Sequence, residues 1–268
     1  MTRITLAIVF LSLIALSQSI VPVGNKSEGD PPKPDGLANG LFKAGLRKEG
    51  KTYSQTFSKE AKKLIEPDRS IKMQYSAFLA KRDSGIVKLL ELSCEGNAEI
   101  ELPGVCKVGI PGSGSHYSFR NRHYVSSRLA DVRLQKGKLH TNGLLIQGLF
   151  VSLGDVPVEG LALTTNGIDH LHSFLPDVSS PLAESQRLQL EKGLKLGDYT
   201  YYRNIELKKN HSYGLRLIAY ASSRKTLSSD HRVDLIAVFR VVAIEPDGSV
   251  TLVWRQLEER DAPMLKDQ

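Results

Sequence analysis

The clearest pattern of hydrophobic and polar positions lies in the last third of the chain. Residues 213–222, 232–245 and 249–257 are rich in branched and aromatic side chains, as β-strands are. The last two are separated by residues 246–248, Pro-Asp-Gly, a turn composition in which proline presets φ and glycine accepts the left-handed region. We predict a C-terminal β-hairpin there. Its apolar face is expected to contain Val233, Leu235, Ala237, Phe239, Val241, Val250, Leu252 and Trp254.

Three other segments have the apolar spacing of short helices, and each is bounded by proline or glycine. They are residues 58–66, 168–175 and 180–193. Four further runs are rich in apolar or branched residues and predict strands: 86–93, 98–102, 143–153 and 156–163. We therefore expect a mainly β fold with minor α (α+β). Its core would be an antiparallel sheet or a sandwich-like domain, with the C-terminal β-hairpin and two or three short helices.

The first nineteen residues have the three parts of a cleavable signal peptide. Arg3 supplies a positive charge, residues 4–16 are apolar and uncharged, and Ser17 and Ser19 place small side chains at the cleavage positions. The apolar run is shorter than the roughly 20 residues of a membrane-spanning helix; an uncleaved anchor that continues to Val23 is the alternative. We expect export to the periplasm or the medium, with no transmembrane span after cleavage.

The rest of the chain divides into a linker and a folded region. Residues 20–50 contain clustered prolines, which disfavour helices and central strands and predict a linker. Residues 51–268 are expected to form a single β-rich domain with a basic N-terminal helical segment. The two cysteines, Cys94 and Cys106, are expected to form one disulfide bond, because exported proteins fold in an oxidising compartment.

Positive charge is concentrated in residues 43–83, which hold eleven Lys or Arg and five Asp or Glu. A basic surface outside the cell attracts anionic polymers or lipid head groups. The residues expected to make this contact are Lys43, Arg47, Lys48, Lys51, Lys59, Lys62 and Lys63. A solvated helix face without a partner is the alternative interpretation. The segment has few aromatic residues and no recognisable nucleic-acid module, so we do not expect nucleic-acid binding.

One cluster carries the residue types of a Ser-His-Asp hydrolase. Residues 112–116, Gly-Ser-Gly-Ser-His, are followed by His123 and Asp131. The segment does not fit the G-x-S-x-G nucleophile elbow, because Pro111 stands at the first position and no helical pattern follows the serine. A flexible loop is the competing interpretation, and no catalytic residue is assigned.

Three smaller patterns also have a functional and a structural interpretation. His170 and His172 form an H-x-H pair, but on a helix they would point about 200° apart, which argues against a metal site. Asp234, with the preceding Asp230 and His231, could form an acid–base group, although Asp234 is expected to be exposed on its strand. Tyr199 and Tyr201 are expected on one face of a strand. They could form a flat, polar-aromatic platform, and ordinary packing of strand residues is the alternative.

These observations favour an exported, non-enzymatic binding or structural protein that contacts an anionic envelope polymer or lipid surface, with a bacterial envelope as the expected setting. No cofactor and no metal site is predicted. The alternative is an extracytoplasmic hydrolase whose site is assembled from distant loops. Its candidate groups are His116, His123, His140, Asp131, Asp155 and Asp198.

Overall fold

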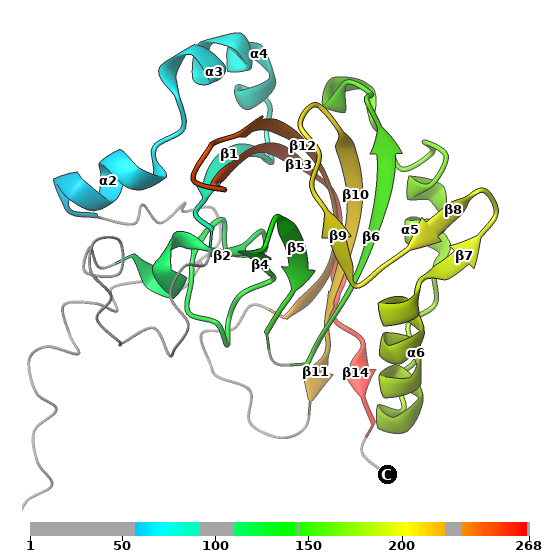
Figure 1. Ribbon diagram of the computed structural model, residues 1–268. Helices are drawn as coiled ribbons and strands as arrows, with labels where there is room; N and C mark the ends of the chain where they lie inside the picture. Colours follow the sequence, from blue (N-terminus) through cyan, green and yellow to red (C-terminus); the bar gives the residue numbers. More distant parts are fainter. Residues whose placement is uncertain (1–56, 92–109, 144, 223–231, 267–268) are drawn as a thin grey trace, which may run out of the picture. The chain divides into compact units, whose positions relative to one another are not determined.

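The computed structural model describes residues 57–91, 110–143, 145–222 and 232–266, all within the compact unit formed by residues 44–268 (Figure 1). The described chain is β-rich, with antiparallel sheets and short helices, and this confirms the fold class predicted from the sequence. The predicted signal peptide, the whole predicted linker, the strand expected at 98–102 and the cysteines Cys94 and Cys106 lie outside the described residues.

The larger sheet, here called sheet A, has five antiparallel strands in the order β1-β13-β12-β10-β6. The strands are β1 (Ser84–Leu89), β6 (Ile146–Gly154), β10 (Ser212–Ala219), β12 (Val233–Ile244) and β13 (Val250–Asp261). The predicted C-terminal hairpin is the β12–β13 pair, in which Phe239 lies opposite Trp254. Strand β13 continues to Asp261, four residues beyond the end predicted for this strand.

The second sheet, sheet B, is also antiparallel and has the order β3-β2-β4-β5-β9. Its short strands are β2 (His116–Ser118), β3 (His123–Tyr124), β4 (Val132–Gln135), β5 (Lys138–Thr141) and β9 (Asn204–Glu206). Strands β4 and β5 alternate between buried and less buried side chains, as in β4, where Val132 and Leu134 are buried.

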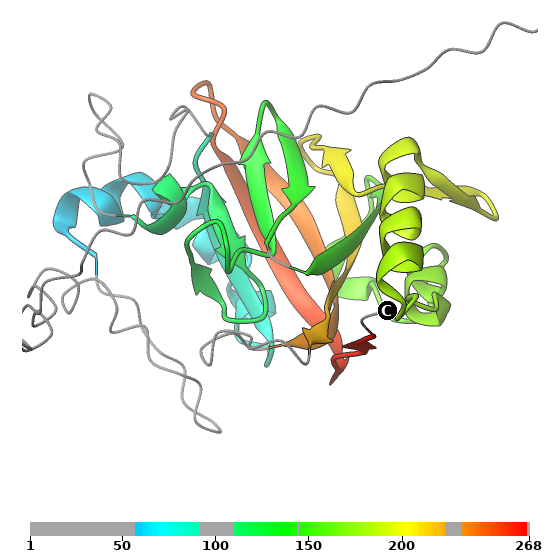
Figure 2. The ribbon, with the colours of Figure 1, turned by 90° about the horizontal axis from the view of Figure 1, so that it is seen from below.

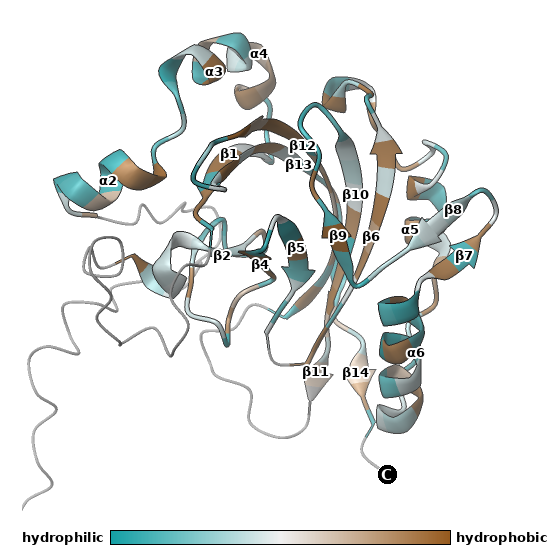
Figure 3. Cartoon of the chain, viewed as in Figure 1, coloured by the Kyte–Doolittle hydropathy of each residue, from teal (hydrophilic) through white to brown (hydrophobic). Residues whose placement is uncertain are grey.

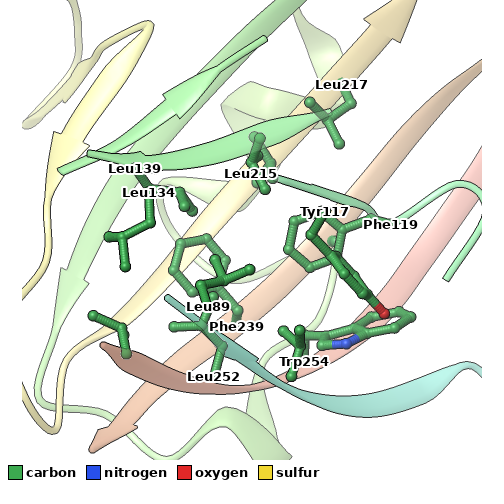
Figure 4. Packing of buried hydrophobic residues seen from close by; sticks show 14 of the residues in the cluster. Leu89, Tyr117, Phe119, Leu134, Leu139, Leu215, Leu217, Phe239, Leu252 and Trp254 are labelled. Carbon is green, nitrogen blue, oxygen red and sulfur yellow. The ribbon is translucent and has the colours of Figure 1, made fainter. Parts of the chain in front are cut away.

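The main hydrophobic core lies between the two sheets, as the close view in Figure 4 shows. Sheet B contributes aromatic residues such as Tyr117 and Phe119, and sheet A contributes Phe239 and Trp254, which contact them ring to ring. The whole apolar face predicted for the C-terminal hairpin is buried in this core. The packing of two apolar sheet faces against each other gives the sandwich-like arrangement expected from the sequence.

The opposite face of sheet A is also covered. Two smaller clusters of buried residues join it to helices and to a hairpin formed by β7 (Leu194–Leu196) and β8 (Tyr199–Tyr201). The helices are α4 (Ser76–Leu79), α5 (Ile168–Ser173), α6 (Ser180–Lys192) and the 3-10 helix η3 (Val158–Gly160). Figure 2, seen from below, shows α6 and the β7–β8 hairpin beside sheet A, on the side away from α2 (Lys59–Ile65).

The helices and the remaining pairing complete the described chain. Helix α3 (Arg69–Gln74) and the 3-10 helix η2 (Pro111–Gly114) precede sheet B, and β11 (Ala221–Ser222) pairs in parallel with β14 (Met264–Leu265). Helices α2, α5 and α6 were predicted; α3 and α4 were not. No helix in the described ranges has the length and apolar character that a membrane-spanning helix requires.

One predicted strand was wrong. Residues 156–163 form the helix η3 and its flanking loops, after Gly154 turns the chain with φ of 78°. Val158 and Leu161 are buried against the outer face of sheet A and account for the apolar pattern. A short apolar run shows that a segment is buried, and its periodicity alone does not distinguish a strand from another buried segment.

Candidate functional site

Helix α2 exposes a basic surface because its apolar residues are used to contact the core. Ala61 and Ile65 are buried, four residues apart on one side of the helix. Ser58 caps the helix, with its hydroxyl oxygen accepting a hydrogen bond from the Ala61 amide at 3.1 Å. The solvent side carries three of the lysines predicted to contact an anionic partner: Lys59, Lys62 and Lys63.

Helix α3 follows directly and turns this surface into a hollow of about 600 Å³, the basic hollow. Pro67 ends α2, and Asp68 caps α3 by accepting a hydrogen bond from the Ser70 amide at 2.6 Å. The hollow is lined by Lys59, Lys62, Lys63, Glu66, Pro67, Arg69 and Lys72. Figure 3 shows hydrophilic residues on both helices.

The basic hollow has a strong excess of positive charge. It contains five cationic side chains and one carboxylate, Glu66, whose Oε1 lies 2.7 Å from Lys72 Nζ. The hydrogen bond from Lys72, and then its charge, hold the pKa of the Glu66 carboxyl below its ordinary value. The other four cations make no hydrogen bond or ion pair with the described part of the chain: Lys59, Lys62, Lys63 and Arg69.

Helix stability accounts for only part of this charge. Lys62 and Lys63 lie in the last turn of α2, where a cation interacts favourably with the helix dipole. Lys59 and Arg69 each occupy the first position of a helix, where the same dipole disfavours a cation. An anion bound in the hollow would reduce the repulsion among all of these groups, and exposed lysines can bind several phosphate or carboxylate geometries.

The basic hollow agrees only in part with the predicted set of contact residues. Lys43, Arg47, Lys48 and Lys51 lie outside the described residues. Sequence reasoning missed Arg69 and Lys72, although both belong to the basic segment 43–83. The signal that could have found Arg69 is its place just after the Pro67-Asp68 break, which starts a second helix beside the first.

The structure separates the groups of the Ser-His-Asp pattern. Ser115 Oγ lies 3.0 Å from His116 Nδ1, and both residues are buried. Asp131, however, is held by Arg120, whose Nε donates to Asp131 Oδ1 at 2.5 Å, and by the Ser118 hydroxyl at 3.1 Å. In the β2–β4 register the residue opposite His116 is an arginine, so the aspartate cannot orient this imidazole.

The other hydrolase candidates do not meet each other in the described chain. His123 Nδ1 lies 2.7 Å from the carbonyl oxygen of Asn121. His140 is on β5, and the residues opposite it on the neighbouring strands, Arg133 and Asn204, are not acidic. Asp155 accepts a hydrogen bond from Arg240 at 2.6 Å. Asp198 lines a different hollow, together with Tyr199 and Tyr202.

The H-x-H pair is split by its helix, as the sequence predicted. His170 stacks on Tyr201 with ring centroids 6.3 Å apart, whereas His172 Nδ1 lies 2.8 Å from Glu258 Oε2. Among the described residues no group of three or more His, Cys, Asp or Glu side chains is placed to hold a metal ion.

Two expectations for other candidates need correction. Asp234 is buried and paired with Arg216, because helix α5 covers the face of β12 that was expected to be exposed. Asp230 and His231 lie outside the described residues. Tyr201 is buried, with its hydroxyl donating to the Gly167 carbonyl at 2.7 Å, so it forms no exposed platform with Tyr199.

Comparison of the chain with protein-family models, with curated proteins and with solved structures gave no significant match.

Proposed function

We propose that the chain is an exported, non-enzymatic binding protein that contacts an anionic surface of the cell envelope through the basic hollow. The observation that carries the proposal is the placement around one hollow of four cations that have no partner among the described residues, among them Lys59 and Arg69 at unfavourable helix positions. Export is supported by the signal-like pattern of residues 1–19. Outside the cytoplasm, phosphate-bearing lipids and polymers are the abundant polyanions that such a hollow would meet.

We prefer binding to hydrolysis because the carboxylates that could act in hydrolysis are paired with arginines, whereas most cations of the basic hollow have no partner in the described chain. The acidic candidates Asp131 and Asp155 are neutralised by arginines, which leaves neither as an available base. Four of the five cations of the basic hollow have no such partner in the described chain and are available to an external ligand. The proposal therefore assigns recognition to an electrostatic surface, where affinity depends on the number of cations and on ionic strength.

The experiment measures binding of the full chain to vesicles of phosphatidylcholine with and without phosphatidylglycerol, at low and high salt. A triple variant, Lys59→Gln/Lys62→Gln/Lys63→Gln, removes three cations while keeping side chains that favour helices. Basic residues near an anionic membrane contribute about 1 kcal/mol each, so the variant should bind phosphatidylglycerol vesicles roughly a hundredfold more weakly at low salt. Direct titration with soluble polyphosphate, compared with the vesicle affinity at the same salt concentration, then tests whether a polymer partner is preferred to a lipid surface.

A matched control removes the same charge elsewhere. Lys192, Lys195 and Lys209 are exposed and lie outside the basic hollow. The Lys192→Gln/Lys195→Gln/Lys209→Gln variant should keep most of the affinity, because only the distribution of charge differs. Equal losses of vesicle affinity in the two triple variants would show that binding depends only on net charge, and this would contradict the proposed site. Binding that does not depend on salt would also contradict it.

A further inference from the structure

A second hollow, of about 580 Å³, has no lining residue in common with the basic hollow and is called the tyrosine hollow here. It is bordered by β8 and β9, with Tyr199 and Tyr202 among its lining residues, and by the start of β10. Its volume is within the range of about 300–1,000 Å³ that is typical of small-molecule sites. Most of its lining residues belong to strands or their immediate ends, which hold side chains more rigidly than long loops do.

The four tyrosines of this region are of two kinds. Tyr201 and Tyr213 are buried, and their hydroxyl groups donate to backbone carbonyls, Tyr201 to Gly167 and Tyr213 to Glu206. Tyr199 and Tyr202 line the hollow, and neither hydroxyl has a hydrogen-bond partner in the described chain. Tyr202 is 37% exposed. Tyr201 and Tyr213 therefore stabilise the fold. Tyr199 and Tyr202 leave aromatic surface and two hydroxyl groups open to a ligand.

Each open ring packs against a glycine. A Cβ atom added at Gly193 would lie 2.6 Å from Cε1 of Tyr202, and one added at Gly167 would lie 3.1 Å from Tyr199. Both glycines have positive φ, 97° and 88°. Only a residue without a side chain allows the backbone to contact the rings this closely. The backbone at the two glycines therefore packs against the rings and holds them in place, so that a ligand can stack on them.

The polar groups around the rings favour a neutral ligand with many hydroxyls. Asp198, Asn204 and Glu206 make no side-chain hydrogen bond or ion pair within the described ranges, and they offer acceptors together with an amide donor. Lys138 and Lys208 also line the hollow and balance the two carboxylates. A hollow with no net charge gives little attraction to an anion or a cation, whereas it can exchange many hydrogen bonds with a polyol.

One further atom requires a partner. The ring of His211 lines the tyrosine hollow, tilted over Tyr213 with centroids 6.5 Å apart. Its Nδ1 is buried, and no hydrogen-bond partner for it is present among the described residues. Because this nitrogen has almost no exposed surface, it is the rest of the His211 ring that borders the space open to a ligand.

We propose that the tyrosine hollow binds a neutral saccharide unit, with the apolar C–H faces of the pyranose ring on Tyr199 and Tyr202 and its hydroxyls on the surrounding polar groups. The site is separate from the basic hollow and does not depend on the function proposed for it. The two sites differ in the ligands that they select, because one is strongly cationic and the other has balanced charge.

The test is isothermal titration of the full chain with maltotriose, cellotriose and tri-N-acetylchitotriose, which are neutral, with the anionic trigalacturonate as comparator. At least one neutral trisaccharide should bind at up to millimolar concentration, with an affinity that salt leaves unchanged. Tyr202→Ala should weaken binding at least about tenfold by removing one stacking surface, and Tyr202→Phe should stay within about twofold of wild type. Tyr199→Ala should act like Tyr202→Ala.

Tyr75→Ala is the control, since Tyr75 packs against Phe78 outside both hollows, and thermal unfolding of each variant establishes that it is folded. The proposal is overturned if no neutral trisaccharide binds, if trigalacturonate alone binds, or if folded Tyr199→Ala and Tyr202→Ala variants bind as wild type does. It is supported if alanine at either tyrosine removes binding and phenylalanine at Tyr202 restores it.

Discussion

Arg216 and Asp234 form a buried, two-pronged ion pair across neighbouring strands of sheet A. Arg216 Nε donates to Asp234 Oδ1 at 2.9 Å, and the second contact, from an amino group to Oδ2, is 2.6 Å. The remaining amino group donates to the carbonyl oxygens of Leu171 at 2.7 Å and Phe174 at 2.5 Å. The arginine therefore ties β10 and β12 to the C-terminal end of α5, and it satisfies carbonyls that a helix end leaves without partners.

Replacing Asp234 with asparagine should destabilise the fold strongly. The substitution leaves a buried guanidinium without its counter-charge, and breaking such a pair costs about 3–5 kcal/mol. We expect the free energy of unfolding of Asp234→Asn, measured with urea, to fall by an amount in this range. A double variant, Arg216→Met/Asp234→Leu, should recover part of the loss, because no unpaired charge remains buried.

The chain offers a matched control in the pair formed by Arg240 and Asp155. This contact is also 2.6 Å long, but the Asp155 side chain is 66% exposed. An exposed ion pair contributes about 0–1 kcal/mol, so Asp155→Asn should change stability little. Similar losses for Asp155→Asn and Asp234→Asn would show that burial does not govern the Arg216 pair.

The wrong expectation for Asp234 shows that burial by a distant segment cannot be predicted from a local sequence pattern. The alternation of β12 predicted one apolar face correctly, from Val233 to Val241. A charged residue on the other face was interpreted as exposed, because most charged residues are. That face is buried by α5, and the hydrogen bond from Arg216 to Leu171 joins segments 45 residues apart. No local pattern encodes such a contact, whereas the hairpin depends on neighbours in the chain.

The candidate sites follow the same division. The basic segment was visible as local charge composition, but the hollow depends on the angle between α2 and α3 at Pro67, which composition does not show. The tyrosine hollow was less visible still. The sequence pattern paired Tyr199 with Tyr201, whereas the chain leaves β8 after Tyr201 and places Tyr202 beside Phe150 in an isolated bridge. One such break in strand regularity changes which side chains share a surface.

Gly148 controls the distance between β6 and sheet B. A Cβ atom built at this position would overlap the Thr141 side chain, although the Gly148 backbone does not require a positive φ. The Gly148→Ala substitution should therefore act by overpacking, which typically costs about 1–3 kcal/mol. Urea unfolding should show this loss, and a second substitution, Thr141→Ser, should reduce it by removing the Thr141 methyl group.

Gly160 provides the comparison for this prediction. It also lacks a positive φ, and a Cβ atom added there would meet nothing within 4 Å. Gly160→Ala should leave stability unchanged or raise it slightly, since alanine restricts the unfolded chain. If Gly148→Ala were as stable as Gly160→Ala, the two sheets would have to be able to separate locally without loss of core packing.

His116 and His140 should make the fold sensitive to mild acid. Burial, first of all, lowers the pKa of both imidazoles below the ordinary value of 6.5, and the charge of Arg133, which lies between them in the sheet, acts in the same direction. The unfolded chain then binds more protons than the folded one as the pH falls below about 6.5, so stability is full above that pH and decreases below it.

We expect His116→Asn and His140→Asn to reduce the slope of unfolding free energy against pH between 7 and 5, and their combination to reduce it most. Arg133→Gln should weaken the slope in part, and none of these variants should change it above pH 8. Urea unfolding at a series of pH values measures these slopes, and an unchanged slope in the double histidine variant would assign the acid sensitivity to other groups.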